Sequence, residues 1–234
     1  MRKPTPHAAP PPPHTTRQCA EALGAIAHAS TLGVLEAYCS DATPEVAETC
    51  SIAAARVRDV LARAAAGEAG AGAREEANPY HSVDPAPAKR VITPAEVPAF
   101  AAQLLDASLP LFERYKAMFS LRNAGSKAAV LALCAGFADP SPLFRHEVAY
   151  VLGQLQHKAS VPALKERTRD AAEHEMVRHE AAEALGAIGD SDCTDFLKTY
   201  TGEDMPVMLK ESCIVALDVA DYWAAPAAAA EGKA

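Results

Sequence analysis

Two short runs of this sequence carry side chains that can bind a metal ion. Arg-His-Glu occurs at residues 145–147 and again 33 positions later at 178–180, and each run is followed by a Leu-Gly pair at the same spacing. Each run offers an imidazole and a carboxylate, and this mixture of ligands suits non-haem iron, manganese or zinc. A zinc-protease site is disfavoured, because neither histidine is followed by another histidine four residues on. The candidate metal ligands are His146, Glu147, His179 and Glu180.

Repetition separates these pairs from ordinary surface polarity. A single His-Glu pair on a helix is usually an exposed polar patch with no ligand. Here the same pair occupies the same place in two adjacent repeats, with arginine before it both times, which favours metal binding. Other histidines lack this frame and are interpreted as surface or linker residues: His28, His81, His157 and His174.

The two runs belong to a longer series of repeats with a step of roughly 31 to 33 residues. We call the position held by His146 and His179 the histidine slot. Tyr115 holds it one step earlier and Glu211 one step later. Near the N-terminus, residues 20–26 repeat residues 182–188 letter for letter, which places Arg17-Gln18 where a His-Glu pair would be and Glu48 in the following slot.

Each repeat is predicted to be a pair of helices. Residues 160–168 and 176–188 carry apolar side chains at three- and four-residue spacing, and Pro- or Gly-containing runs separate the units. A helix pair cannot bury its apolar face alone, so neighbouring pairs are expected to stack into an all-α solenoid. Neighbouring helix axes lie roughly 8–10 Å apart, which would bring the two His-Glu pairs together on the concave wall. The glycine of each Leu-Gly pair is predicted to serve packing, by letting helices approach or by ending one.

Composition agrees with a helical protein and excludes several classes. Half of the 234 residues are apolar and 6% are aromatic. The net charge of −8 argues against a nucleic-acid partner, and no apolar stretch approaches the length of roughly 18 residues that a membrane span needs. The six cysteines are scattered and the N-terminus lacks an apolar signal core, so a cytoplasmic protein with reduced thiols is expected.

The sequence also predicts a division of the chain. Residues 17–62 and 93–223 are expected to form two repeat arrays, and the second carries both His-Glu pairs. Residues 63–92 are rich in Ala, Gly and Pro and are predicted to be a linker. The Pro-rich residues 1–16 and the Ala-rich residues 224–234 are predicted to be disordered.

The residues around the two runs resemble the deoxyhypusine hydroxylase family of HEAT-repeat di-iron enzymes. The resemblance lies in residues 110–115, 121–125, 143–157 and 176–180, and in the linker run 78–87. It implies a HEAT-like solenoid and an oxidoreductase, deoxyhypusine monooxygenase. Such an enzyme hydroxylates the deoxyhypusine side chain of a translation initiation factor to hypusine, using dioxygen at two Fe(2+) ions. The resemblance also implies that His146, Glu147, His179 and Glu180 are iron ligands.

The N-terminal half departs from the family pattern. The family uses four His-Glu pairs, two from each half, whereas this half begins with Arg17-Gln18 in the second slot, and the unit expected before it is missing. A pair of irons would then be under-coordinated, because half of the ligand set is absent. An inward-pointing Arg17 would also oppose cation binding through its positive charge. A homodimer of two C-terminal halves would restore four pairs, so monomer and homodimer both stay open.

Two other functions stay open beside hydroxylation. One is a non-catalytic HEAT-repeat scaffold, or a truncated gene product, that has lost half of the di-iron ligands. The other is a mononuclear metal enzyme. Glu183, one turn after His179, is predicted either to support the ligands or to belong to the helix surface. Glu48 and Glu211 are further candidates on position alone.

Overall fold

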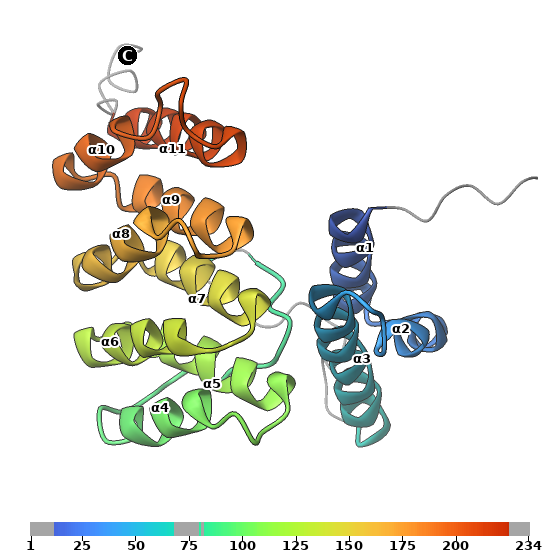
Figure 1. Cartoon of the computed structure of the whole chain (residues 1–234). Helices are drawn as coiled ribbons and strands as arrows, with labels where there is room; N and C mark the ends of the chain where they lie inside the picture. The colour runs from blue at the N-terminus through green and yellow to red at the C-terminus, as the bar shows by residue number, and fades with distance from the viewer. Residues whose placement is uncertain (1–11, 68–79, 81, 225–234) are drawn as a thin grey trace, which may run out of the picture. The chain divides into compact units, whose positions relative to one another are not determined.

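The computed structural model describes residues 12–67, 80 and 82–224, and every regular element among these residues is a helix (Figure 1). The all-α prediction is therefore confirmed. The chain divides into two compact units, Met1–Pro85 and Ala86–Ala234, and this boundary falls inside the predicted linker. None of the described helices is long and apolar enough to cross a membrane.

The described part of the N-terminal unit holds α1 (Pro13–Ile26), α2 (Leu32–Tyr38) and α3 (Pro44–Ala65), with a 3-10 turn at Ala29–Thr31. Helix α1 includes residues 13–16, which the sequence assigned to a disordered tail. Proline suits the first position of a helix, because its fixed φ is helical and that position needs no N–H donor. Residues 1–11 lie outside the described residues. The helices enclose a small core of Ala20, Leu35, Val46, Cys50, Ala53, Ala54 and Val57.

The C-terminal unit is a stack of helix pairs. Its α-helices are α4 (Val97–Leu105), α5 (Leu111–Ala124), α6 (Lys127–Ala135), α7 (Pro142–Leu155), α8 (Val161–Arg169), α9 (Glu175–Ile188), α10 (Ser191–Lys198) and α11 (Val207–Ala224). Helices α5, α7, α9 and α11 carry the successive slots, and Figure 1 shows them following one another from green to red. Helix α7 packs on α9 and α9 packs on α11, as the repeat step predicted.

The Leu-Gly pairs set how closely consecutive slot-bearing helices approach. In each case a glycine of one helix faces an alanine of the next, in the pairs Gly24–Ala53, Gly153–Ala184 and Gly186–Ala216. A Cβ on Gly186 would lie only 2.5 Å from the Ala216 carbonyl oxygen. The glycine always comes seven residues after its slot (146 to 153), and the alanine five after the next slot (179 to 184). The predicted packing role is confirmed, and this shared register aligns neighbouring slots.

An arginine precedes three of the four slots in the C-terminal unit, and it ties the slot-bearing helix to the segment before it. Arg114 Nε donates to the Leu104 carbonyl at 2.9 Å, and Arg178 Nε donates to the Thr168 carbonyl at 3.1 Å. Both carbonyls lie in the last turn of the preceding helix, α4 or α8, where a carbonyl has no N–H donor within its own helix. Arg145 Nη1 donates to the carbonyl of Asp139, in the connection before α7, at 2.6 Å. The arginine of each Arg-His-Glu run therefore belongs to the scaffold.

Candidate metal centre

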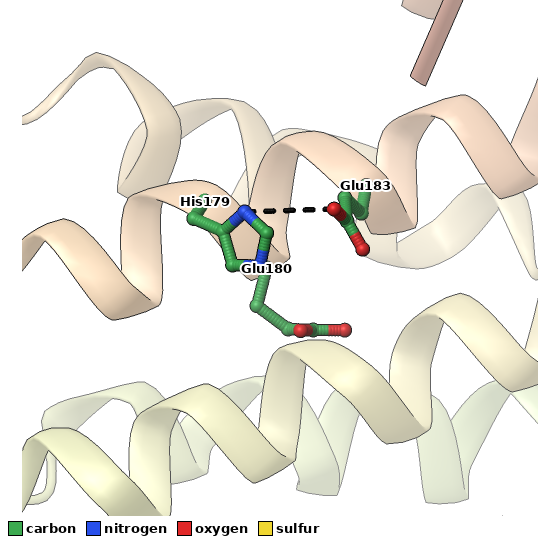
Figure 2. Close-up of side chains that lie close together, drawn as sticks. All are labelled: His179, Glu180 and Glu183. Atoms are coloured by element: carbon green, nitrogen blue, oxygen red, sulfur yellow. Dashed lines mark ion pairs between the residues drawn. The ribbon is translucent and has the colours of Figure 1, made fainter. Parts of the chain in front are cut away.

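Helices α7 and α9 bring most of the predicted ligands together. His146 Nε2 on α7 lies 3.2 Å from Glu180 Oε2 on α9. His179, Glu180 and Glu183 each offer a ligand atom within 4.8 Å of the others, the one such group of three found among the described residues. Figure 2 shows His179 and Glu183 side by side along α9. We call His146, His179, Glu180 and Glu183 the His-Glu cluster.

Membership of this cluster differs in one residue from the predicted ligand set. Glu147 is half-buried beside His146 on α7 and lies outside the three-ligand group. Glu183 is added instead, because residues four apart face the same side of a helix and its Oε1 lies 3.5 Å from His179 Nδ1. The sequence had marked Glu183 by this one-turn spacing, without deciding its role. Ligation by each of the four predicted residues, Glu147 included, stays a prediction.

The cluster is sheltered at its centre and open at its edge. The side chains of His146 and Glu180 are 14% and 12% exposed, whereas those of His179 and Glu183 are 34% and 40% exposed. The pKa of the Glu183 carboxyl is raised by burial above all; His179 lowers this pKa, Glu180 raises it and His146 lowers it. The two carboxylates repel one another, and the two imidazoles can offer lone pairs when they are neutral. A bound cation would therefore be stabilised at this cluster.

His179 has a further partner on α11. Its Nδ1 lies 2.7 Å from the Oγ of Ser212, which is buried. The slot register explains both histidine contacts: each imidazole faces the residue that follows the next slot, Glu180 for His146 and Ser212 for His179. Sequence reasoning missed Ser212, although its place directly after the slot at Glu211 would have indicated it.

The slots of the N-terminal unit belong to a different compact unit from the His-Glu cluster. Arg17 pairs with Glu21 on α1, so its charge is compensated within its own helix. Gln18 is exposed. Glu48 on α3 is half-buried. Glu211 on α11, in the same unit as the His-Glu cluster, is exposed and lies outside the three-ligand group found among the described residues.

Three histidines outside the frame have a structural role that the sequence did not predict. The Nδ1 of each accepts the backbone N–H two residues later, at 3.2, 3.0 and 3.2 Å, and so caps the start of a helix. These are His28, His157 and His174. His81, interpreted as a linker residue, lies outside the described residues.

The fold and the family comparison first define a class. A family model described as HEAT repeats matches residues 97–176 and 130–218, which together cover 122 of the 234 residues (97 to 218). The chain is a HEAT-repeat protein whose repeats carry paired imidazoles and carboxylates on neighbouring helices.

Comparison with whole proteins narrows the class. Deoxyhypusine hydroxylase of Drosophila melanogaster is 48% identical over 214 residues, which cover 92% of this chain and 67% of that protein. The Homo sapiens enzyme is 47% identical over 213 residues, covering 90% and 66%. The structure of human deoxyhypusine hydroxylase in complex with glycerol matches with a TM-score of 0.80 at 46% identity, over 90% of this chain and 69% of that one. The chain belongs to the deoxyhypusine hydroxylase family, and it spans about two thirds of the length of these relatives.

Proposed function

We propose that this protein hydroxylates the deoxyhypusine side chain of the hypusine-bearing translation initiation factor in the cytoplasm, with dioxygen as oxidant. The family supplies the reaction. The observation on this chain that carries the proposal is the approach of His146 Nε2 to the Glu180 carboxylate, 3.2 Å apart across two repeats. This contact makes one cluster from the two His-Glu pairs.

The donor set of the cluster fits iron. Two imidazoles and at least one carboxylate on one face are the ligands that non-haem iron takes when it keeps positions open for oxygen. The proposed ligands are His146, Glu147, His179 and Glu180, and the family pattern has two Fe(2+) ions per active centre. Iron bound there would supply the activation of dioxygen.

The residues of the chain supply position and charge. Gly153 packs closely against Ala184 and so helps α7 and α9 to hold His146 and Glu180 in register; a Cβ added at Gly153 would lie 3.1 Å from the Cα and Cβ of Ala184, and the two helices would have to shift to make room. The carboxylates of Glu180 and Glu183 give the cluster negative charge, which attracts a substrate side chain that carries amines. Burial above all raises the pKa of the Glu183 carboxyl, so this carboxyl holds a proton more readily than a free glutamate does.

The test measures bound iron and dioxygen-dependent hydroxylation of the deoxyhypusine-bearing factor by the purified chain. Substituting both His146→Ala and His179→Ala should remove the iron and the hydroxylation together. His14→Ala is the matched control, because His14 is an exposed histidine on α1, and it should change neither. Light scattering on the same samples gives the oligomeric state, so that the measured iron content can be expressed per chain and per oligomer.

Two results would overturn the proposal. A well-folded wild-type chain that takes up no iron and hydroxylates nothing would instead favour the non-catalytic scaffold. One bound metal per chain with no hypusine formed would indicate a different, mononuclear metal enzyme.

A further inference from the structure

The hydroxyl of Ser212 makes two contacts with one oxygen. Its Oγ lies 2.7 Å from His179 Nδ1 and 2.7 Å from the carbonyl of Met208, one turn earlier on α11. Ser212 is only 5% exposed, so water competes little for either contact. A hydroxyl has a single hydrogen to donate and two lone pairs to accept with. The direction of the contact with His179 therefore depends on where that hydrogen goes.

Other hydroxyls in this chain indicate the direction. Ser120 Oγ donates to the Lys116 carbonyl four residues earlier at 2.6 Å, and it accepts the backbone N–H of Lys89 at 3.0 Å. A backbone N–H can only donate, so Ser120 must accept there. Thr49 holds the position of Ser212 in the N-terminal unit, and it too donates to the carbonyl four residues earlier, at 2.7 Å. By the same arrangement, Ser212 gives its hydrogen to α11 and offers a lone pair to His179.

The carboxylate of Glu183 also favours a hydrogen on His179 Nδ1. Its Oε1 lies 3.5 Å from the same ring nitrogen, His179 Nδ1. A hydrogen on that nitrogen is attracted by the carboxylate, whereas a lone pair there is repelled. Both neighbours of Nδ1 therefore favour an N–H at this position.

We infer that Ser212 is a positioning residue, which holds His179 in the tautomer with its hydrogen on Nδ1 and so leaves the lone pair of Nε2 for a metal ion. In metal sites the hydrogen bond of the second ring nitrogen sets both the tautomer and the orientation of the ligating imidazole. The metal part of this inference rests on the proposed function. The tautomer is a property of the metal-free chain and is tested separately.

The first measurement reads the tautomer directly. Long-range proton–nitrogen correlation spectra of the whole metal-free chain are recorded over a range of pH, and the tautomer is read from the spectra in which the His179 ring is neutral. Wild type should show the Nδ1–H form of His179. Ser212→Ala should raise the Nε2–H population, and Ser212→Thr, which installs the side chain found at Thr49, should restore the wild-type pattern. A wild-type His179 in the Nε2–H form would overturn the inference, whatever the activity.

The second measurement is the affinity of the metal-free protein for Co(II), titrated optically. Ser212→Ala should weaken binding by about 10–100-fold, the usual effect of removing a partner of a ligating histidine, and Ser212→Thr should stay close to wild type. Thr49→Ala is the matched control, because it removes the equivalent hydroxyl where the facing slot holds Arg17, and it should change neither readout. Circular dichroism checks that each variant is folded.

The outcomes separate the two proposals. Equal Co(II) affinity in wild type and Ser212→Ala would overturn the positioning role even if the chain hydroxylates its substrate. A shifted tautomer and weakened Co(II) binding in Ser212→Ala, with no hydroxylation by wild type, would support the role of Ser212 and sink the proposed reaction alone.

Discussion

Removal of Glu173 should weaken the contact between the parts of the chain that carry the two His-Glu pairs. It lies between α8 and α9, and its carboxylate accepts from Arg145 Nη2 at 2.6 Å and from Arg145 Nε at 3.0 Å. Arg167 Nη1 lies 3.4 Å away, and the backbone N–H of His174 donates at 2.7 Å. The Glu173 side chain is 2% exposed and that of Arg145 is 14% exposed. One buried carboxylate thus compensates two guanidinium groups, one of them next to His146.

Glu173→Gln should lower the free energy of unfolding by about 3 kcal/mol at neutral pH. Breaking a buried ion pair by removing one partner costs about 3–5 kcal/mol, because the other charge is left uncompensated. The lower end applies here, since Arg145 keeps its hydrogen bond to the Asp139 carbonyl and retains some exposure. Glu203→Gln is the matched control: Glu203 pairs with Lys210 at 2.7 Å but is 95% exposed, and exposed pairs contribute little.

The effect should depend on pH in a definite direction. Burial raises the pKa of Glu173, but the hydrogen bonds from Arg145 and the His174 N–H, with the charges of Arg145 and Arg167, lower it by more. The folded-state pKa is therefore below the unfolded value of about 4.3. The stabilisation is complete above that value and is lost as the pH falls through the folded pKa. The difference between wild type and Glu173→Gln should be constant near neutral pH and shrink below about pH 4.

Urea unfolding followed by circular dichroism, at neutral pH and at about pH 3.5, measures both effects. A Glu173→Gln protein as stable as Glu203→Gln at neutral pH would show that the buried pair contributes nothing to this contact. A difference that grows on acidification would show that the carboxylate is not the stabilising form.

Three further predictions test the scaffold. Gly186→Ala should destabilise the chain by about 1–3 kcal/mol, because its Cβ would lie 2.5 Å from the Ala216 carbonyl oxygen. Gly33→Ala is the control: a Cβ there would have no atom within 4 Å, and this variant should be more stable than wild type by up to about 1 kcal/mol. Equal urea midpoints for the two variants would contradict this. Chelation of bound metal should lower the melting temperature only modestly, since the repeats have their own apolar core, and a loss of helicity in circular dichroism would contradict it. Burial raises the pKa of Cys134 to about 11, so a thiol reagent should label it far more slowly than the exposed Cys19 in the folded chain; equal rates before denaturant is added would refute this.

The repeat register was enough to predict that His146 and Glu180 lie close together. The step between slots aligns successive slot-bearing helices, and the Leu-Gly pairs allow these helices to approach closely. The contact of His146 with Glu180 therefore follows from the periodicity. The role of Arg145 does not follow from periodicity, because its partner Glu173 lies in an irregular connection whose path depends on the packed structure. Helix-capping histidines were missed for a related reason: a histidine that accepts a local backbone N–H has no periodic signature.

Comparison of the two units shows which parts of the site belong to the repeat and which to its chemistry. Glu21 on α1 corresponds to Glu183 on α9, and each lies beside its slot residue, Arg17 in the first case and His179 in the second. Thr49 corresponds to Ser212, and both hydroxyls bond the carbonyl one turn earlier. The surrounding carboxylate and hydroxyl are therefore present whether or not the slot offers a ligand. Since the same supporting positions accompany an arginine in one unit and a histidine in the other, the residue in the slot distinguishes a repeat with candidate metal ligands from one without them.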